Sequence, residues 1–459
     1  MFINGLRVLA FATSLLSVAA VSVTPRNDTL ILFDPKLLAD DAFTASQFSE
    51  LYAKLTNELH YNVHTKSYAD LSAKSDDAKF ELDFANHRYA NLVLLPTSLK
   101  KLPKLSAGKL LDFVNDASPE LAQQANVFVV SSPKHVNDDF RAFLNELGIY
   151  PAPKNHRVVD HFNYVDVEAS KHDLLRLPLV SGENLVANQH IVRDLDSILY
   201  EGSAALISNS PLLIPVVKAS RTAYTANSKD AADVWALGSQ ANLVVAFQGA
   251  ENNNRVVWLG SDALVGNEFL VAETSNSQLV TDLLRWCFQE TGVIKLADAS
   301  LTQTHPARDL KISDEVTYAI TLALWNPATA AWEPFHTTDL QLEVIMLDPY
   351  YRVFLQEAEE TASGVVYSRT FKLPDHHGIF KFLVDYKQAG LAFVRDEIVR
   401  PIRHLANDEF PRSWELTNAW VYISGAVTVV VAWFVFVVLM LYSDDGEKKV
   451  LVEESKKDI

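Results

Sequence analysis

Residues that could do acid–base or metal chemistry occur at a few scattered positions in this chain. Asp160 and His161 are adjacent and could form an acid–base pair, but no nucleophile and no third member of a triad lies near them in the sequence. His60 and His64 have the i, i+4 spacing of a metal pair, yet no Glu lies between them and they straddle the predicted end of a helix. Their spacing is better explained by a solvated surface than by zinc binding.

The other candidates are a second histidine pair and one thiol. His376 and His377 stand in a predicted turn at 374–378, and the turn is enough to explain them. Cys287 lies on the apolar face of a predicted helix beside Trp286, which indicates a buried structural thiol and not a nucleophile.

Nucleotide-binding and hydrolase motifs are absent from the sequence. The first predicted strand runs into Asp34-Pro35-Lys36 without the glycines that let backbone approach a pyrophosphate. The chain also has no Walker loop and no Gly-x-Ser-x-Gly elbow. The sequence therefore predicts no catalytic, cofactor-binding or metal-binding residues and no cofactor.

The amino-acid composition indicates an ordinary folded protein without disulfide bonds. A hydrophobic content of 49% with 21% charged residues is typical of a folded chain. The net charge of −17 argues against nucleic acid as a partner, because phosphates require a basic surface. Cys287 is the one cysteine, so no intramolecular disulfide is possible and the cores alone must hold the fold.

Short apolar runs alternate with amphipathic helical patterns up to about residue 300. The alternation predicts an α/β domain at 23–300, Rossmann-like, with a mostly parallel sheet covered on both faces. Helices are expected near residues 48–59, 140–147 and 277–290. The predicted strands are 29–33, 61–67, 91–95, 126–131, 242–248 and 255–260.

After about residue 300 the apolar period changes from helical to alternating. Apolar residues recur at every second position in 318–324, 340–346 and 380–386. This pattern predicts a β-sandwich-like domain at 301–412, between the α/β domain and a membrane.

Both ends of the chain carry membrane-targeting patterns. Residues 1–22 have one basic residue, a short apolar core and small residues before the expected cleavage site, as a secretory signal peptide does. The uncharged stretch Trp420–Tyr442 covers roughly 34 Å at about 1.5 Å per residue, enough for one transmembrane helix. We therefore expect a juxtamembrane segment and span at 413–442 and a cytosolic tail at 443–459.

Orientation follows from the signal peptide. The basic residues on the two sides of the span are too balanced to decide it, whereas a cleaved signal peptide leaves the bulk of the chain lumenal. Lys456 and Lys457 then stand three and four places from the C-terminus, the position of a dilysine retrieval signal. The expected location is the endoplasmic reticulum membrane, as a single-pass type I protein.

Two further features follow from this topology. Asn27-Asp28-Thr29 is the one glycosylation sequon, so Asn27 is a candidate glycosylation site. Within the span, Ser424, Thr428 and Ala432 recur every four residues and form a strip of small side chains, a candidate face for packing against another helix.

Six stretches stand out in order along the chain: 29–34, 160–164, 253–262, 284–293, Asp348-Pro349 and 371–380. Together they resemble the family of 48 kDa subunits of the eukaryotic oligosaccharyltransferase complex, and the resemblance runs from about Thr29 through the span. Two departures are Phe162, where the family typically has a second His, and residues 115–125, where a Gly-rich turn is usual.

The resemblance implies a non-catalytic accessory subunit of the complex that transfers a preassembled glycan from dolichyl diphosphate to asparagine in nascent chains. The partners it implies are the catalytic subunit, ribophorin I, a ribophorin II-type subunit and a small defender-against-cell-death-type subunit. The Trp-Trp-Asp motif of the catalytic subunit is absent, since no two tryptophans are adjacent. Two alternatives stay open: a cargo receptor cycling between the endoplasmic reticulum and the Golgi, and an independent lumenal glycan-processing enzyme.

Overall fold

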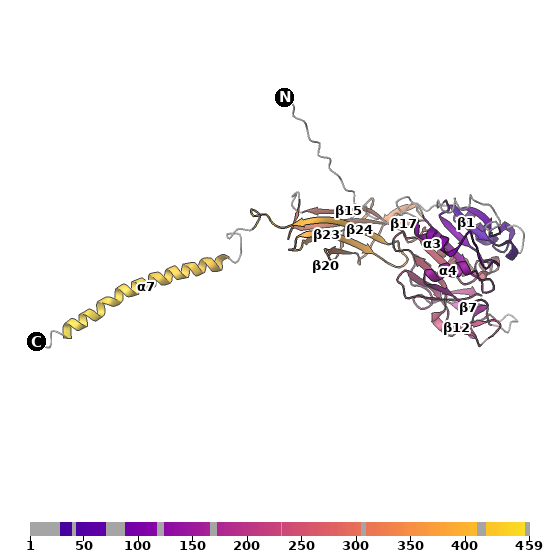
Figure 1. The fold of residues 1–459 in the computed structure, drawn as a ribbon, viewed down its shortest axis with the longest axis horizontal. Helices are drawn as coiled ribbons and strands as arrows, with labels where there is room; N and C mark the ends of the chain where they lie inside the picture. Colours follow the sequence, from indigo (N-terminus) through magenta and orange to yellow (C-terminus); the bar gives the residue numbers. More distant parts are fainter. Residues whose placement is uncertain are drawn as a thin grey trace, which may run out of the picture.

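The computed structural model describes residues 28–38, 43–69, 88–116, 124–165, 172–230, 232–303, 309–410 and 419–454, with 443–454 as backbone alone. These residues form three parts that follow one another along the chain (Figure 1). We call the part from β1 to α6 the α/β body and the part from β15 to β24 the β body; helix α7 is the third. Signal-peptide residues 1–22, Asn27, Lys456 and Lys457 lie outside the described residues.

A nine-stranded sheet forms the centre of the α/β body, in the order β2-β1-β3-β4-β14-β13-β9-β5 with β10 paired to β13. Four of its strands, β1, β3, β4 and β14, are buried almost throughout, as continuous apolar runs predict. The strands are β1 (Asp28–Phe33), β2 (Asn62–Ser67), β3 (Asn91–Leu94), β4 (Asn126–Val130), β5 (Ile149–Pro151), β9 (Ala205–Ile207), β10 (Leu213–Lys218), β13 (Asn242–Gln248) and β14 (Arg255–Leu259).

The sheet is mixed, which differs from the mostly parallel sheet expected. Strands β2, β1, β3, β4 and β14 pair in parallel, but β14 pairs antiparallel with β13, and β13 pairs antiparallel with β9 and β10. The loop 249–254 is too short for a crossover connection, so β13 and β14 can pair only as antiparallel neighbours. The parallel prediction therefore holds for one half of the sheet.

Helices cover both faces of the sheet. Side chains such as Leu92 and Val127 join a core with α3 (Ala107–Asp116) and α4 (Asp138–Glu146). Side chains such as Val93 and Phe128 point the other way and join a core with α1 (Ser49–Ala53) and α6 (Thr274–Cys287). Alternate residues of each strand thus enter different cores, as the period of a β-strand requires.

Short helices and two small sheets complete the α/β body. The small sheets have the orders β12-β11-β6 and β7-β8. Their strands are β6 (His156–Val159), β7 (Leu175–Pro178), β8 (Ser197–Tyr200), β11 (Tyr224–Asn227) and β12 (Val234–Leu237). The short helices are η1 (Pro35–Leu37), η2 (Phe43–Ala45), the π-turn η3 (Lys54–Glu58), η5 (Gly238–Gln240), η6 (Ala263–Val265) and α5 (Asn267–Ala272).

Helix α6 begins and ends three residues earlier than the predicted helix at 277–290. Gln289, and not a glycine, takes the left-handed backbone conformation after the helix, with φ of 60°. Its side-chain amide donates to the Asn126 side chain and to the Asn253 carbonyl, both at 3.0 Å. These tertiary bonds fix the helix end at a residue that local sequence rules do not favour.

The β body contains two five-stranded sheets, β15-β17-β22-β21 with β18 paired to β17, and β16-β24-β23-β19-β20. The alternating residues Tyr318, Val344 and Phe382 are fully buried in one cluster shared by both sheets, which confirms the predicted strand period. The strands are β15 (Ile294–Gln303), β16 (Leu310–Lys311), β17 (Glu315–Asn326), β18 (Ala331–Pro334), β19 (Gln341–Ile345), β20 (Pro349–Phe354), β21 (Gln356–Thr361), β22 (Gly364–Lys372), β23 (Gly378–Tyr386) and β24 (Val394–Arg403).

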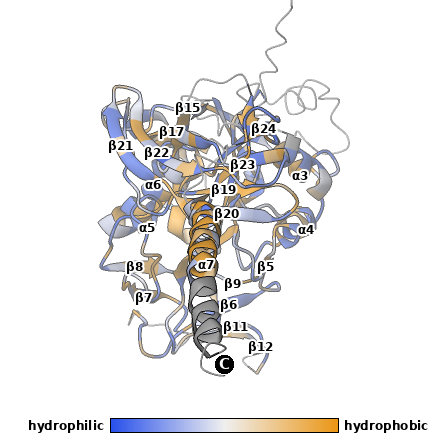
Figure 2. Ribbon diagram, turned by 90° about the vertical axis from the view of Figure 1, so that its left-hand side faces the viewer, coloured by the Kyte–Doolittle hydropathy of each residue, from blue (hydrophilic) through white to orange (hydrophobic). Residues whose placement is uncertain are grey.

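Helix α7 (Ala419–Glu454) projects away from both bodies (Figure 1). Its part Ala419–Tyr442 has a mean hydropathy of 2.6, is not buried by the rest of the chain, and is long and apolar enough to cross a membrane. Figure 2 shows the apolar residues in orange along this part of the helix. The structure thus contains the one apolar helix that the sequence predicts near the C-terminus.

Arg255, at the start of β14, is fully buried and joins the two bodies. Its guanidinium donates to the carbonyls of Trp286, Thr291 and Gly292 at 2.7, 2.7 and 2.8 Å, and lies 4.6 Å from the centre of the Trp286 ring. Burial lowers the pKa of Arg255 to about 9, so the group is still charged at neutral pH. It therefore binds the end of α6 and the link to β15 as one unit.

The loop between β23 and β24 docks on this unit. The Asn253 amide makes two backbone bonds to Phe393, and the Trp286 indole donates to the Gly390 carbonyl at 2.9 Å. Gly292 and Gly390 both have positive φ, and a Cβ on Gly292 would lie 2.2 Å from the Gly390 carbonyl oxygen. The two backbones can approach this closely because both residues are glycines.

Replacing Arg255 with Met should destabilise the full chain by on the order of 3 kcal/mol, because three buried carbonyls lose their donor. The midpoint of urea unfolding in detergent, followed by tryptophan fluorescence, should fall. Arg369→Met is the matched control, since Arg369 is an exposed arginine on β22; it should change stability by less than about 0.5 kcal/mol. Equal midpoints for the two variants would contradict the role given to Arg255.

Candidate functional site

The main cleft lies at the carboxyl ends of the parallel strands. After β1 the chain forms β2 on one side of it and β3 on the other, so the strand order reverses between β1 and β3. Open α/β sheets bind ligands at such a reversal. A cavity of about 130 Å³ lies here, between Asp34, Leu95 and Ser132, and a larger one of about 410 Å³ adjoins it and shares Ser132 and Asp262.

Asp34, the acid at the end of β1, is used by the fold. Its carboxylate accepts from the backbone of Lys36 and Ser98 and from the hydroxyls of Ser98 and Thr97. Burial alone would raise the pKa of Asp34, but these hydrogen bonds outweigh it and hold the pKa below its usual value. The residue fixes the strand end and is not free to act as a base.

A serine, a histidine and an aspartate meet in the cleft although they are far apart in the sequence. Ser132, His135 and Asp262 all line the smaller cavity, a combination that resembles a hydrolase triad in composition. In the described part of the chain, no hydrogen bond or ion pair joins these three side chains, whereas a nucleophile must lie within hydrogen-bond reach of its base. The sequence analysis missed this convergence, because the residues follow two different strands.

The charged groups of the larger cavity are only partly paired. Arg157 binds Asp173 at 2.6 Å and Glu201 at 2.8 Å. Lys134 and Asp262 line the same cavity and, among the described residues, form no ion pair. The cleft can therefore hydrogen-bond a polar ligand, but its geometry contains no assembled nucleophile and base.

The adjacent Asp160 and His161 do not act on each other. Asp160 is fully buried, and its carboxylate accepts from the Phe162 backbone and from the side chains of Asn163, Ser220 and Thr222. Burial opposes ionisation, yet these bonds lower the pKa of Asp160 below its usual value. This carboxylate therefore stabilises the turn at residues 160–163.

His161 turns outward instead. Its Nδ1 lies 2.5 Å from Nδ1 of His172, and its Nε2 lies 2.9 Å from the Tyr224 hydroxyl. Phe162, the next residue, is 78% exposed. The acid–base pair considered from the sequence is therefore not formed: Asp160 is buried and bonds its own turn, whereas His161 contacts His172 and Tyr224 at the surface.

The two histidine pairs considered from the sequence have ordinary surroundings in the structure. His60 is exposed in a left-handed turn, while His64 lies in β2 with its ring 5.5 Å from that of Tyr89. The His376 ring contacts the Asp375 carboxylate at 2.8 Å in an exposed turn. Over the residues that the structure describes, no group of three or more His, Cys, Asp or Glu side chains could hold a metal ion.

Cys287 is fully buried, as predicted. Its Sγ lies 3.5 Å from the Val127 carbonyl oxygen, and burial raises the pKa of the thiol well above its usual value. A thiol that is protonated and enclosed at neutral pH is not a nucleophile. The prediction of a structural cysteine is confirmed.

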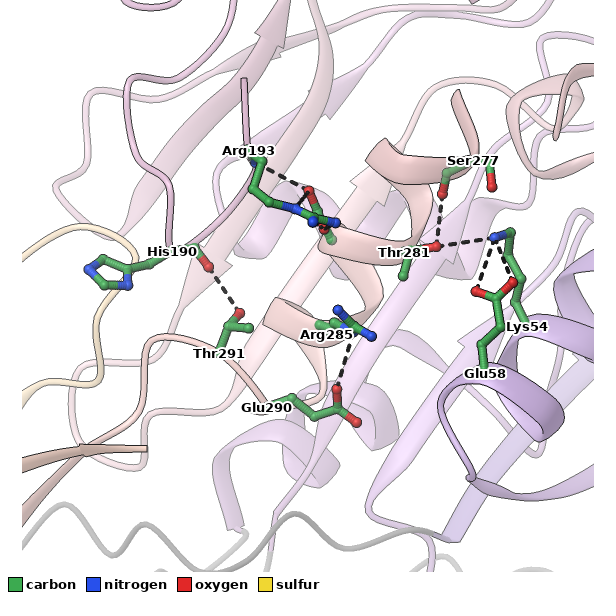
Figure 3. A network of polar contacts seen from close by, with 10 residues as sticks. Lys54, Glu58, His190, Arg193, Ser277, Thr281, Arg285, Glu290 and Thr291 are labelled. Atoms are coloured by element: carbon green, nitrogen blue, oxygen red, sulfur yellow. Dashed lines mark hydrogen bonds and ion pairs between the residues drawn. The ribbon is translucent and has the colours of Figure 1, made fainter. Parts of the chain in front are cut away.

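Polar side chains of α6 form hydrogen bonds and ion pairs with neighbouring segments of the fold (Figure 3). Arg193 binds Asp282 through two nitrogens, at 3.1 and 2.7 Å. Lys54 contacts both Glu58 and the Thr281 hydroxyl at 3.3 Å. These contacts tie the segments around residues 54 and 193 to the helix and line neither cavity described above.

The candidate strip in α7 is exposed along the helix. The Thr428 hydroxyl donates to the Ser424 carbonyl at 2.8 Å, and the Ser424 hydroxyl donates to the Val421 carbonyl at 3.0 Å. Both hydroxyls are therefore satisfied within the helix, and Ala432 adds no polar group. The strip can enter an apolar environment without an unpaired donor.

Comparison with known proteins gives matches over nearly the whole chain. The model of the OST48 N-terminal domain matches residues 19–290, and that of the OST48 middle domain matches residues 299–444. The dolichyl-diphosphooligosaccharide–protein glycosyltransferase subunit WBP1 of Saccharomyces cerevisiae is 34% identical over 449 residues, covering 96% of each chain. The corresponding subunit of Schizosaccharomyces pombe is 29% identical, covering 89% of this chain and 92% of the relative.

An animal relative matches over a similar length. The dolichyl-diphosphooligosaccharide–protein glycosyltransferase 48 kDa subunit of Drosophila melanogaster is 27% identical over 455 residues, covering 92% of this chain and 96% of the relative. The first family model alone matches more than half of the sequence, and both bodies are included. This chain belongs to the OST48 family.

Proposed function

We propose that this chain is a non-catalytic accessory subunit of an oligosaccharyltransferase complex. Such a complex transfers a preassembled glycan from dolichyl diphosphate to the asparagine of N-x-S/T sequons. The observation that carries the proposal is the match to the yeast glycosyltransferase subunit over 96% of both chains. Its role would be to assemble and stabilise the complex.

The geometry of the cleft supports a non-catalytic role. Ser132, His135 and Asp262 line it without a bond between their side chains, and Asp34 and Asp160 have their carboxylates occupied by structural hydrogen bonds. Accessory function, and not glycan transfer of its own, fits these residues best.

The proposed topology places both bodies in the lumen of the endoplasmic reticulum. Residues 1–22 would be a signal peptide, 23–300 a Rossmann-like α/β domain, 301–412 a β-sandwich-like domain, and 413–442 the juxtamembrane segment and span. The parallel strands β2, β1, β3 and β4 and the core shared by the two sheets of the β body support these fold assignments. The tail 443–459 would be cytosolic, with Lys456 and Lys457 as a retrieval signal and Asn27 as a lumenal glycosylation site.

The proposed partners are the catalytic subunit, ribophorin I, a ribophorin II-type subunit and a small defender-against-cell-death-type subunit. The exposure of α7 along its apolar length leaves room for their helices. The strip Ser424, Thr428 and Ala432 would be the face that packs, since small side chains allow close approach.

The activity prediction uses variants of the cleft. The full chain purified alone should transfer no glycan from a dolichyl-linked donor to a sequon peptide, and depletion in cells should leave glycoproteins underglycosylated. In the assembled complex, His135→Ala should keep activity within a factor of about two, whereas loss of a working general base costs about 10²–10⁴-fold. A loss of that size, or transfer by the isolated chain, would falsify the accessory role.

The tail prediction concerns Lys456 and Lys457. Replacing both with serine should send part of an overexpressed, partner-free population to the Golgi, because a receptor reads the lysines by position. Acquisition of Golgi-type glycan processing measures the escape. Replacing Lys448 and Lys449 instead is the control, which keeps the same net charge change. Equal retention of both variants would show that the terminal pair is passive.

The helix prediction concerns Thr428. Enlarging it to Leu should weaken copurification of the small membrane subunits, since a bulky side chain keeps helices apart while the segment stays hydrophobic. Val430→Leu is the matched control, because two residues turn roughly 200° around a helix and place the change on the opposite face. A full subunit set with Thr428→Leu would mean that assembly depends on the lumenal bodies.

A further inference from the structure

We call the end of the β body at which β24 finishes the tip. It comprises the turn 346–348 between β19 and β20, residues 373–379 at the start of β23, and residues 404–410 after β24. The register of β23 pairs Gly378 with Ile402 at the end of β24, and a Cβ on Gly378 would lie 2.9 Å from Met346 Sδ. Figure 1 shows this end of the sheets on the side from which the chain continues to α7.

Apolar side chains protrude from the tip into solvent. Leu347 is 89% exposed, Ile379 is 67% exposed and Phe410 is 53% exposed. The register pairs Ile345 with Lys381, so the turn 346–348 and Ile379 lie at the same end of β19 and β23. Their neighbours Phe380 and Val344 are fully buried, so the core ends just behind these exposed side chains.

An ion-pair clamp fixes where the chain leaves the tip. The Glu409 carboxylate accepts two bonds from the Arg403 guanidinium, at 2.7 and 2.8 Å, and contacts Lys311 Nζ at 2.7 Å. These bonds hold the pKa of Glu409 well below its usual value. Because Arg403 ends β24 and Lys311 ends β16, the clamp binds the departing segment to the sheet.

The length of the connection then limits how far the tip can be from the span. Nine Cα–Cα steps separate Phe410 from Ala419, the first residue of α7. Even a fully extended chain covers only roughly 3.3–3.6 Å per residue, so Phe410 lies within about 32 Å of the start of the span. Leu347 and Ile379 are exposed at the same end of the β body as the departing chain.

We infer that the tip rests on the lumenal surface of the membrane, with Leu347 and Ile379 in the boundary between headgroups and acyl chains. Exposed leucine and isoleucine gain by leaving water, and the tether removes most of the entropic cost of bringing them to the bilayer. The contact gives the β body a second support beside α7. The inference rests on the part of the proposed function in which α7 spans a membrane, but not on the identity of the complex.

The experiment places one reporter at a time on the full chain. Cys287 is buried, so cysteines introduced as Leu347→Cys and Ile379→Cys can be labelled selectively with an environment-sensitive NBD fluorophore. The proteins are reconstituted into phosphatidylcholine nanodiscs with or without brominated acyl chains. Leu237→Cys, at a 63% exposed position in β12 of the α/β body, is the water-exposed control, and Val430→Cys in α7 is the membrane control.

At positions 347 and 379 we expect blue-shifted emission, loss of fluorescence in brominated discs, and low sensitivity to aqueous iodide. Position 237 should show the opposite response. If 347 and 379 respond like 237 while 430 is quenched by bromine, the tip does not touch lipid and the inference is overturned.

Two other outcomes can be told apart from contact with lipid. Shielding of 347 and 379 from iodide in the assembled complex, without quenching by brominated lipid there or in the isolated chain, would assign the tip to a partner subunit and also overturn the inference. Failure of position 430 to be quenched would instead refute the spanning role of α7, and with it the topology in the proposed function.

Discussion

The buried guanidinium of Arg255, which forms no ion pair with any described carboxylate, joins the two bodies of this protein. Arg255 binds the carbonyls of Trp286, Thr291 and Gly292, and so joins the last turn of α6 to the link that leads to β15. Taking a charge out of water is costly unless hydrogen bonds compensate it, and the two terminal nitrogens of this guanidinium donate to three carbonyls. One connected set of hydrogen bonds therefore holds the end of α6, the link and the β23–β24 loop, and from it we predict that the two bodies move as one rigid piece.

This constraint supports the accessory role proposed above. Carboxylates that could serve as bases, Asp34 and Asp160, accept several hydrogen bonds each, and the one cysteine is enclosed in the core. The cleft at the strand ends keeps the shape of a binding site, with Ser132, His135 and Asp262 gathered but not joined. The described residues form two bodies joined by hydrogen bonds, and one apolar helix that follows them in the chain.

Much of the architecture could be predicted from the sequence because it depends on local patterns. The alternation at Phe380, Phe382 and Val384, the continuous apolar strands and the uncharged span all follow from burial and periodicity. The early end of α6 could not be predicted, since Gln289 adopts its left-handed conformation only through bonds to residues 126 and 253. The sequence also did not predict that Ser132, His135 and Asp262 line one cleft, because these residues follow separate strands that meet only in the folded sheet.

The rigidity of the two-body unit is the central structural claim, and a distance measurement tests it directly. Spin labels on Val271→Cys in the α/β body and Arg369→Cys in the β body occupy exposed positions, and double electron–electron resonance on the full chain reports the distance between them. We predict a single narrow distance distribution, which broadens when Asn253→Ala removes the bonds to Phe393. A broad or multiple distribution in the unaltered chain would contradict the account.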